Sequence, residues 1–335
     1  MNTAIIRILT IALALLPVAA SADPIELKFS FFTSDRSNIY QNTVKPFVDA
    51  VNSEGQGLIH IQMYFSGAIS RSQELQPQLV ASGAADLAVI VPGQSPERFG
   101  DTAVMELPGI YSDSREASLV FTHLIDAGAL NGYGEFFVVG AFVSAAESIH
   151  SRQYIGSIGD LAGLAIRTNN KIESDALAKL GAIPVLMPIN QTTDAISRDK
   201  IDGATAPPSM LFEFGIGRVV TNHYMLQLGG APTALVMNRG KFDSLPPQAQ
   251  AIIRKYGGRW LAERSAAAMV AADKDTLEQL KSDPRRSIVY PSPADLEVAR
   301  KAYAAVVAEW AALMPHNSEL LSLATAEIKK LRASN

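Results

Sequence analysis

The chain has 335 residues and a formal charge of −4, from 29 Lys and Arg against 33 Asp and Glu. This mildly acidic balance argues against a nucleic-acid partner, because binding a phosphate backbone needs clustered Lys and Arg, and no run of basic residues here is longer than a pair such as Arg285-Arg286. The absence of cysteine excludes disulfides, a thiol nucleophile and a lipid anchor on cysteine.

Residues 1–22 have the pattern of a secretory signal peptide. Arg7 supplies the positive charge, residues 8–16 form the apolar run, and Ala20 and Ala22 are the small residues before a signal-peptidase site. The alternative, a membrane anchor, is disfavoured because the apolar run is shorter than the roughly 20 residues of a spanning helix. We therefore expect a mature chain that starts near Asp23 and resides in the periplasm.

Residues 23–143 alternate between short apolar strands and amphipathic helices. The expected strands are 25–31, 58–65, 87–91 and 136–145, and the expected helices are 39–51, 71–81 and 115–130. Short strands of this kind suit a parallel sheet covered on both faces. Because the chain is also longer than one hydrophobic core usually holds, this segment predicts the first of two α/β lobes.

A second alternating series fills residues 144–229 and predicts the second α/β lobe. Its expected strands are 164–167, 183–187 and 201–205, and its expected helices are 172–180 and 192–198. The chain is then expected to return to the first lobe over residues 230–265, with a buried strand at 233–237. One helix over 248–282 is long enough to touch both lobes. Residues 266–335, with helices at 294–313 and 319–331, are expected to pack on the lobes.

The sequence contains no motif of a catalytic or metal site. Its five histidines lack metal-ligand spacing such as H-E-x-x-H. The nucleophile elbow G-x-S-x-G, the phosphate-binding P-loop and a complete G-x-G-x-x-G are also absent. We therefore expect no metal, no cofactor and no catalytic residues. A secreted enzyme stays open as an alternative, because carboxylate pairs leave no sequence motif.

Six short segments follow one another in a set order. They are Phe65-Ser66-Gly67, residues 83–88, Glu106-Leu107-Pro108, residues 158–167, residues 200–203 and residues 234–238. In order and spacing, over about residues 25–310, they resemble the solute receptors of tripartite ATP-independent periplasmic (TRAP) transporters, the DctP type. The resemblance implies an α/β, two-lobed periplasmic-binding-protein-like fold with hinge strands and a long lobe-spanning helix. It implies a receptor rather than an enzyme, which captures a small organic acid and delivers it to the small and large membrane subunits of the transporter.

The resemblance also assigns a role to Arg167. In that family the arginine that ends the segment D-L-x-G-L-x-I-R forms a bidentate pair with the ligand carboxylate, and Arg167 has that place. The chemistry agrees, because a planar guanidinium offers two parallel donors to two carboxylate oxygens, which lysine cannot do. The alternative is a solvated arginine at the end of a strand, and the surrounding motif argues against it.

Two positions depart from the sialic-acid-binding members of the family. Where those members have a second arginine, this chain has Glu147, and where they have an asparagine after the D-G pair, it has Ala206. Both changes argue against sialic acid. If Glu147 faces the cleft, an unpaired buried carboxylate is costly, so it should pair with Arg167 or with a cationic group on the ligand. The alternative for Glu147 is a solvated position at the edge.

The remaining candidate ligand-binding residues follow from their positions at the ends of expected strands and helices. They are Ser34, Asp35, Phe65, Glu74 and Gly93 in the first lobe, and Asn169, Asn190 and, as a further hydrogen-bonding amide, Asn238 later in the chain. Asn190 is also a possible N-cap for the helix that follows it. An apolar wall at Ala206 suits a ligand with one carboxylate and an uncharged body.

The expected mechanism is hinge closure, in which a ligand that contacts both lobes only in the closed form shifts the population toward that form. The competing hypotheses are a carboxylate-binding protein of an ATP-driven or chemosensory system, a secreted enzyme and a purely structural periplasmic protein.

Overall fold

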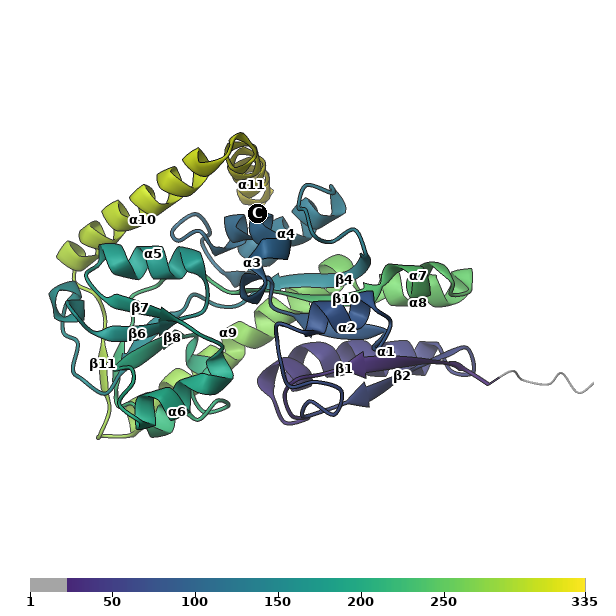
Figure 1. The fold of residues 1–335 in the computed structure, drawn as a ribbon, viewed down its shortest axis with the longest axis horizontal. Coiled ribbons are helices and arrows are strands. Elements are labelled where there is room, and N and C mark those ends of the chain that lie inside the picture. The colour runs from purple at the N-terminus through teal and green to yellow at the C-terminus, as the bar shows by residue number, and fades with distance from the viewer. Residues whose placement is uncertain (1–22, 335) are drawn as a thin grey trace, which may run out of the picture.

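The computed structural model describes residues 23–334, so the predicted signal peptide lies outside the described residues. Two separate β-sheets, each flanked by helices, form the two halves of the elongated molecule (Figure 1). This mixed α/β, two-lobed arrangement with a long connecting helix confirms the predicted fold class.

The first sheet has five strands in the order β2-β1-β3-β10-β4. Its strands are β1 (Ile25–Ser30), β2 (Ile59–Tyr64), β3 (Leu87–Ile90), β4 (Phe136–Val143) and β10 (Pro232–Asn238). β1 pairs parallel with β2 and β3, whereas β10 runs antiparallel between β3 and β4. The helices of this lobe are α1 (Lys45–Glu54), α2 (Gln76–Ala81), the short α3 (Pro96–Phe99), α4 (Ser114–Asp126), α7 (Arg239–Asp243) and α8 (Pro247–Lys255).

The second sheet has six strands in the order β11-β9-β5-β8-β6-β7. They are β5 (Ser148–Ser151), β6 (Ala165–Thr168), β7 (Ile183–Leu186), β8 (Gly203–Ala206), β9 (Asn222–Tyr224) and β11 (Ser287–Val289). β6 is parallel to both β7 and β8, so the carboxyl ends of these three strands meet at one edge. Two helices, α5 (Lys171–Lys179) and α6 (Thr192–Ser197), connect these strands. The sequence pattern missed β5, β9 and β11, which contain three or four residues each and include polar residues such as Ser148, His150 and Asn222 in place of a continuous apolar run.

Two extended segments cross between the sheets, one from β4 to β5 and one from β9 to β10. Glu147 N–H donates to the Gly229 carbonyl at 3.2 Å, and Leu228 N–H donates to the Glu147 carbonyl at 2.9 Å. On the first-sheet side, Ser144 N–H donates to the Ala231 carbonyl at 3.0 Å. The segments therefore pair with each other where they cross, and this pairing fixes the position of Glu147.

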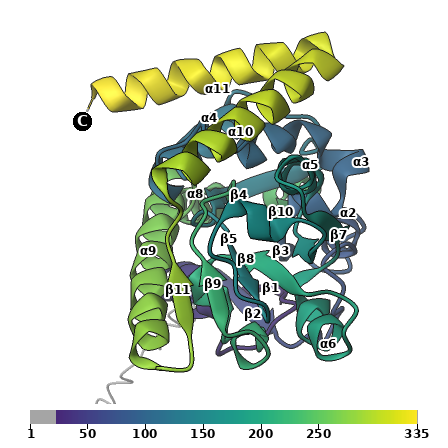
Figure 2. The same ribbon diagram turned by 90° about the vertical axis from the view of Figure 1, so that its left-hand side faces the viewer.

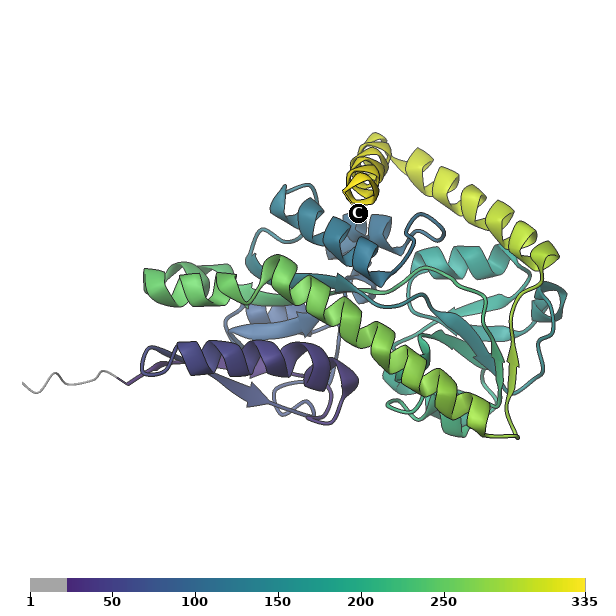
Figure 3. The same cartoon turned by 180° about the vertical axis from the view of Figure 1, so that it is seen from behind.

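A third connection is helix α9 (Gly258–Ser282), which runs diagonally across both lobes (Figure 3). Leu261 packs near its start on the first sheet, and Leu280 near its end belongs to the core of the second lobe. The single helix predicted over 248–282 is wrong in one respect, because α8 ends at Lys255 and a break separates it from α9. Gly257 and Gly258 cause the break: a Cβ on Gly257 would lie 2.3 Å from the Val139 carbonyl oxygen, and Gly258 has a φ of +51°.

The predicted helix over 71–81 is also shorter than expected, since α2 begins only at Gln76. The amide of Gln76 donates to the carbonyls of Ser70 and Ser72, each at 3.0 Å, and holds the preceding residues as a loop. These two bonds give residues 70–72 an alternative to helical hydrogen bonding.

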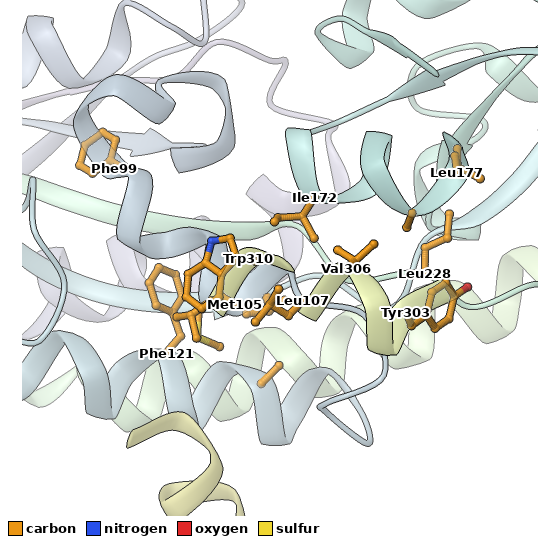
Figure 4. Close-up of a cluster of buried hydrophobic side chains, with 14 of the residues drawn as sticks. Phe99, Met105, Leu107, Phe121, Ile172, Leu177, Leu228, Tyr303, Val306 and Trp310 are labelled. Carbon is orange, nitrogen blue, oxygen red and sulfur yellow. The ribbon is translucent and has the colours of Figure 1, made fainter. Parts of the chain in front are cut away.

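The last two helices, α10 (Pro293–Leu313) and α11 (Pro315–Ala333), lie over one side of both lobes (Figure 2). α10 packs against α5 of the second lobe, and α11 packs against α4 of the first. One cluster of buried apolar side chains accordingly extends from Phe121 on α4 to Leu177 on α5 and Trp310 on α10 (Figure 4). Within residues 23–334, no helix combines the length and the hydropathy needed to cross a membrane.

Candidate functional site

Arg167 lies on β6, at the edge where the carboxyl ends of the three parallel strands meet, and only 1% of it is exposed. Its Nε donates to the Met187 carbonyl at 2.9 Å and its Nη1 donates to the Thr205 carbonyl at 3.1 Å. Its Nη2 donates to Asn169 Oδ1 at 2.9 Å. The alternative of a solvated arginine is therefore wrong. These bonds come from the segments after β7 and β6 and from β8, so the local fold of the second sheet positions the guanidinium.

The guanidinium has more donors than these three bonds use. A guanidinium carries five N–H groups, one on Nε and two on each terminal nitrogen. Subtracting the three bonds leaves one N–H on Nη1 and one on Nη2 without a hydrogen-bond partner among residues 23–334. Burial lowers the pKa of Arg167, and the neighbouring Glu147 and Glu173 raise it.

Glu147 lies on the crossing segment and is 3% exposed, so the solvated alternative for this residue is also wrong. Its Oε2 is 4.0 Å from Arg167 Nη1, which is ion-pair range but too long for a hydrogen bond. The same oxygen has no hydrogen-bond partner among the described residues. The two charges thus face each other without a direct bond, and a ligand group could lie against either one.

Two further buried carboxyls, Glu173 and Glu106, lie near Glu147, and neither is among the site residues that the sequence predicts. Glu173 Oε2 accepts from the Asn169 N–H at 2.7 Å, whereas its Oε1 is buried without a partner. Burial and the nearby charge of Glu147 raise the pKa of Glu173. The same two causes raise the pKa of Glu106 to about 8. The site therefore contains three buried carboxyls and one guanidinium.

A signal for each was present in the sequence. Glu173 stands three residues after Asn170, the N-cap of α5, whose side chain accepts from the Glu173 N–H at 2.8 Å. A glutamate at that position is typically part of a helix cap, so the sequence did not indicate a ligand-binding role for it. Glu106 belongs to the Glu106-Leu107-Pro108 segment that carried the family resemblance. Nothing in either pattern indicates that both side chains are buried beside Glu147.

The two lobes touch each other through polar contacts, one of which lies next to Arg167. Gln94 Nε2, from the loop after β3, donates to the Asn169 carbonyl at 2.8 Å. Elsewhere along the interface, Asn38 N–H of the first lobe donates to Glu213 Oε2 of the second at 2.8 Å. Asn169 thus joins the guanidinium to the opposite lobe.

The other predicted ligand residues are more scattered. Ala206 is fully buried at the end of β8, and its carbonyl oxygen lies 3.0 Å from His150 Nε2. Phe65 packs edge-on against Tyr40, with ring centroids 4.7 Å apart. Ser34 is half-buried in the loop after β1, where its hydroxyl accepts from Arg36 N–H at 3.3 Å.

Asp35, Glu74 and Asn190 are exposed, so the structure does not bring their side chains to the guanidinium. The prediction of Asn190 as an N-cap is wrong, because Gln191 precedes α6 and no side chain caps that helix. A short 3₁₀ turn over Ile189–Gln191 takes up the residues before the helix. Asn238 does cap a helix, since its Oδ1 accepts from Lys241 N–H at 2.9 Å at the start of α7.

A cavity of about 670 Å³ lies next to this site, between α3, α5 and α10. Gly93 and Glu106 are among its lining residues, and Arg167 is not. The cavity therefore lies near the guanidinium, but the guanidinium is not part of its wall.

Two α/β lobes, joined by crossing segments and a long helix, with a buried guanidinium at their junction, are the architecture of a bilobal solute-binding protein. The profile of the family described as bacterial extracellular solute-binding protein, family 7 (DctP) matches residues 29–313, so the chain belongs to this family and the predicted resemblance is confirmed.

Individual relatives agree with this assignment. The C4-dicarboxylate-binding periplasmic protein DctP of Rhodobacter capsulatus is 23% identical over 249 residues, which cover 72% of this chain and 73% of that protein. A TRAP solute-binding protein from Rhodoferax ferrireducens, solved with copurified benzoate, is 27% identical with a TM-score of 0.84, covering 93% of this chain and 100% of that one. A marine-metagenome TRAP solute-binding protein specific for aromatic acid ligands is 24% identical with a TM-score of 0.86, covering 91% and 99%.

Proposed function

We propose that the protein is the periplasmic solute receptor of a TRAP transporter and that Arg167 clamps the carboxylate of a small organic acid. The observation that carries the proposal is the pair of N–H groups, one on each terminal nitrogen, that no group in residues 23–334 uses. Two donors on one rigid, planar group match the two oxygens of a carboxylate. The remaining bonds of the guanidinium hold it in place before the ligand arrives, which reduces the entropic cost of binding.

The charges around Arg167 favour an acid with a single carboxylate. A second carboxylate on the ligand would meet Glu147, whose Oε2 is already 4.0 Å from the guanidinium. An uncharged or cationic body avoids this repulsion, and an apolar wall at Ala206 would suit such a body. The benzoate held by the Rhodoferax ferrireducens relative is an acid of this kind. We therefore infer a monocarboxylate rather than the C4-dicarboxylate of the Rhodobacter capsulatus relative.

We further propose that the ligand is enclosed by hinge closure. The first lobe would comprise residues 23–143 and 230–265, and the second would comprise residues 144–229, with residues 266–335 packed on both. Two observations support this: the interface has direct bonds between the lobes at Gln94 and Asn38, and only a few segments cross it. Identical small-angle scattering profiles with and without a saturating ligand would contradict closure.

The partners would be the small and large membrane subunits of the transporter. The description of the family as extracellular supports a secreted receptor. Amino-terminal sequencing of the protein recovered from a periplasmic extract is expected to begin near Asp23. Capture of both membrane subunits on the ligand-loaded receptor, and not on an Arg167 variant, is the expected result for delivery.

The ligand is best sought with a thermal-shift screen. The panel contains aromatic and aliphatic monocarboxylates, dicarboxylates, keto acids, amino acids and betaines. A ligand at about 100 times its dissociation constant adds roughly 2.7 kcal/mol to the free energy of unfolding, which raises the melting temperature visibly. Arg167→Lys keeps the buried charge but loses the two parallel donors, so it tests the clamp more cleanly than alanine. Arg152→Ala is the matched control, because Arg152 is a partly exposed arginine of the same lobe that pairs with Asp199.

A shift by one acid in the wild type and in Arg152→Ala, but not in Arg167→Lys, supports the clamp. An equal shift in all three proteins means that Arg167 does not hold the carboxylate. Glu147→Gln then shows whether the ligand body is uncharged or cationic. The variant should bind an acid with an uncharged body at least as tightly as the wild type does. A ligand with a cationic group should instead lose affinity. If no member of the panel shifts the wild type, the proposed class of ligand is wrong.

A further inference from the structure

We propose that the cavity between α3, α5 and α10 is a second ligand site, which binds an organic cation with an apolar body through Glu106. Arg167 does not line this cavity, although Glu106 and Gly93 do, so the proposal does not depend on the carboxylate clamp.

The cavity is large enough for a ligand and is formed mostly by apolar side chains. Its volume of about 670 Å³ is typical of small-molecule sites. Phe99 from α3, Ile172 from α5 and the pair Val306 and Trp310 from α10 are among its walls. In Figure 4, Ile172, Val306 and Trp310 lie close together, and Phe99 lies on another side. Aromatic faces of this kind also attract organic cations.

Glu106 places one buried carboxyl in this wall. The residue is 5% exposed, and a Cβ added to Gly93 would lie only 2.6 Å from Glu106 Oε1 and 3.2 Å from the Cβ of Asn170. The carboxyl therefore lies between two other lining residues, at a place that only glycine leaves open. Neither oxygen has a hydrogen-bond partner among residues 23–334, and only burial and the nearby Glu147 shift its pKa, both upward.

The charges of the lining residues leave Glu106 as the acid that lacks a counterion. Lys171 pairs with Asp175 along α5, and Lys179 pairs with Glu309 of α10 at 2.7 Å. These four charges cancel one another at the rim. Behind Glu106, the guanidinium of Arg167 faces Glu147, and no cation is among the groups that shift the pKa of Glu106, so the buried guanidinium does not serve as its counterion. An ammonium with an apolar body would supply both the counterion and the apolar filling.

Two glycines make a matched pair of variants for the test. A Cβ on Gly100, which lines the cavity, or on Gly134, which does not, would meet no atom within 4 Å, and neither residue has a positive φ. Gly100→Trp should therefore place a large side chain at the cavity without disturbing the fold, and Gly134→Trp is the control. Glu106→Gln removes the charge and keeps the shape.

The probe is 2-phenylethylammonium chloride, with 2-phenylethanol as its uncharged counterpart, measured by isothermal titration calorimetry. A pH of about 8.5 populates the ionised form of Glu106. We expect saturable binding of the ammonium at millimolar concentration or below, and binding at least about tenfold weaker in Glu106→Gln, because a charge-assisted hydrogen bond is lost. Gly100→Trp should bind more weakly still, whereas Gly134→Trp and Arg167→Lys should bind as the wild type does.

Any one of four results would overturn the proposal. The first is the absence of saturable binding at millimolar ammonium. The second is equal affinity for the ammonium in Gly100→Trp and Gly134→Trp, which would place the ligand elsewhere. The third is equal affinity for the ammonium and the alcohol in the wild type, which would leave no role for Glu106. Loss of binding in Arg167→Lys with full binding in Gly100→Trp would assign the ammonium to the acid site instead.

Discussion

Replacing His223 by asparagine tests the buried histidine pair that lies behind the candidate site. His150 and His223 face each other on β5 and β9 with their Nδ1 atoms 2.9 Å apart, and they are 0% and 1% exposed. His150 Nε2 must donate to the Ala206 carbonyl, so its Nδ1 accepts from His223 Nδ1–H. The remaining nitrogen of His223 faces the guanidinium of Arg286 at 3.4 Å and acts as an acceptor. Both rings are therefore neutral in the folded protein.

The magnitude follows from the difference in protons bound by the folded and unfolded chains. Burial, together with His150 and Arg286, lowers the pKa of His223 from 6.5 to about 3, and burial lowers that of His150 to about 4. The folded pKa values lie below the unfolded ones, so the stabilisation is complete above about pH 6.5 and is lost as the pH falls. Each histidine contributes a slope of about 1.4 kcal/mol per pH unit below that point. From about pH 6.5 to 4.5, His223 alone should remove about 2 kcal/mol from the stability.

The assay is urea unfolding at several pH values, followed by the fluorescence of the two tryptophans. In the His223→Asn variant, the asparagine amide can still donate to His150, but the contact with Arg286 is lost, so we expect a cost of about 1–2 kcal/mol at about pH 8. Below about pH 6.5 the variant should lose stability less steeply than the wild type, and the two curves should converge or cross. His123→Asn, at a half-exposed position on α4, is the control. Parallel curves for wild type and His223→Asn over this range would refute the reasoning.

Three further predictions concern other parts of the fold. Glu106→Gln should be more stable than the wild type at about pH 8 and equal to it near about pH 5. The pKa of Glu106 is about 8 in the folded protein and 4.5 in the unfolded chain, so the wild type loses up to about 4 kcal/mol of folding stability as the pH rises between these values. Identical urea midpoints for the two proteins at both pH values would contradict this. Gly140→Ala should cost about 1–3 kcal/mol, because the new Cβ would lie 2.4 Å from Leu261 Cδ2 and force α9 away from β4; an unchanged melting temperature would count against that packing. Arg332→Ala should cost no more than about 1 kcal/mol of folding stability. Arg332 makes two bonds of 2.7 and 2.8 Å to Glu116, but half of the arginine is exposed to solvent, which weakens the ion pair. A loss of several kcal/mol would mean that the pair is shielded from water.

The sequence determined the elements whose signal is local and periodic. Alternation and helical spacing predicted β1, β2, β3 and β10 and the helices α4, α5 and α10 to within a few residues. Ordered motifs predicted the family and the two-lobed fold. The type of residue at position 167 predicted a carboxylate-binding group, because the chemistry of a guanidinium belongs to the residue itself. The break before α9 had a signal in the glycine pair at 257 and 258, but a helix tolerates a glycine unless packing makes its lack of a side chain necessary.

Only the tertiary structure decided which side chains are buried together. Glu147, Glu173 and Glu106 are separated by tens of residues, and each also has an ordinary interpretation as a solvated or capping residue. Their burial depends on the crossing of two segments at Gly229 and on the start of α5, neither of which has a local pattern. Conversely, Glu74 near the start of an expected helix and Asn190 after an expected strand are exposed to solvent. Burial and the electrostatic field are sums over neighbours that are distant in the chain, so the composition of a site depends on the fold even when the residue at its centre can be predicted from the sequence.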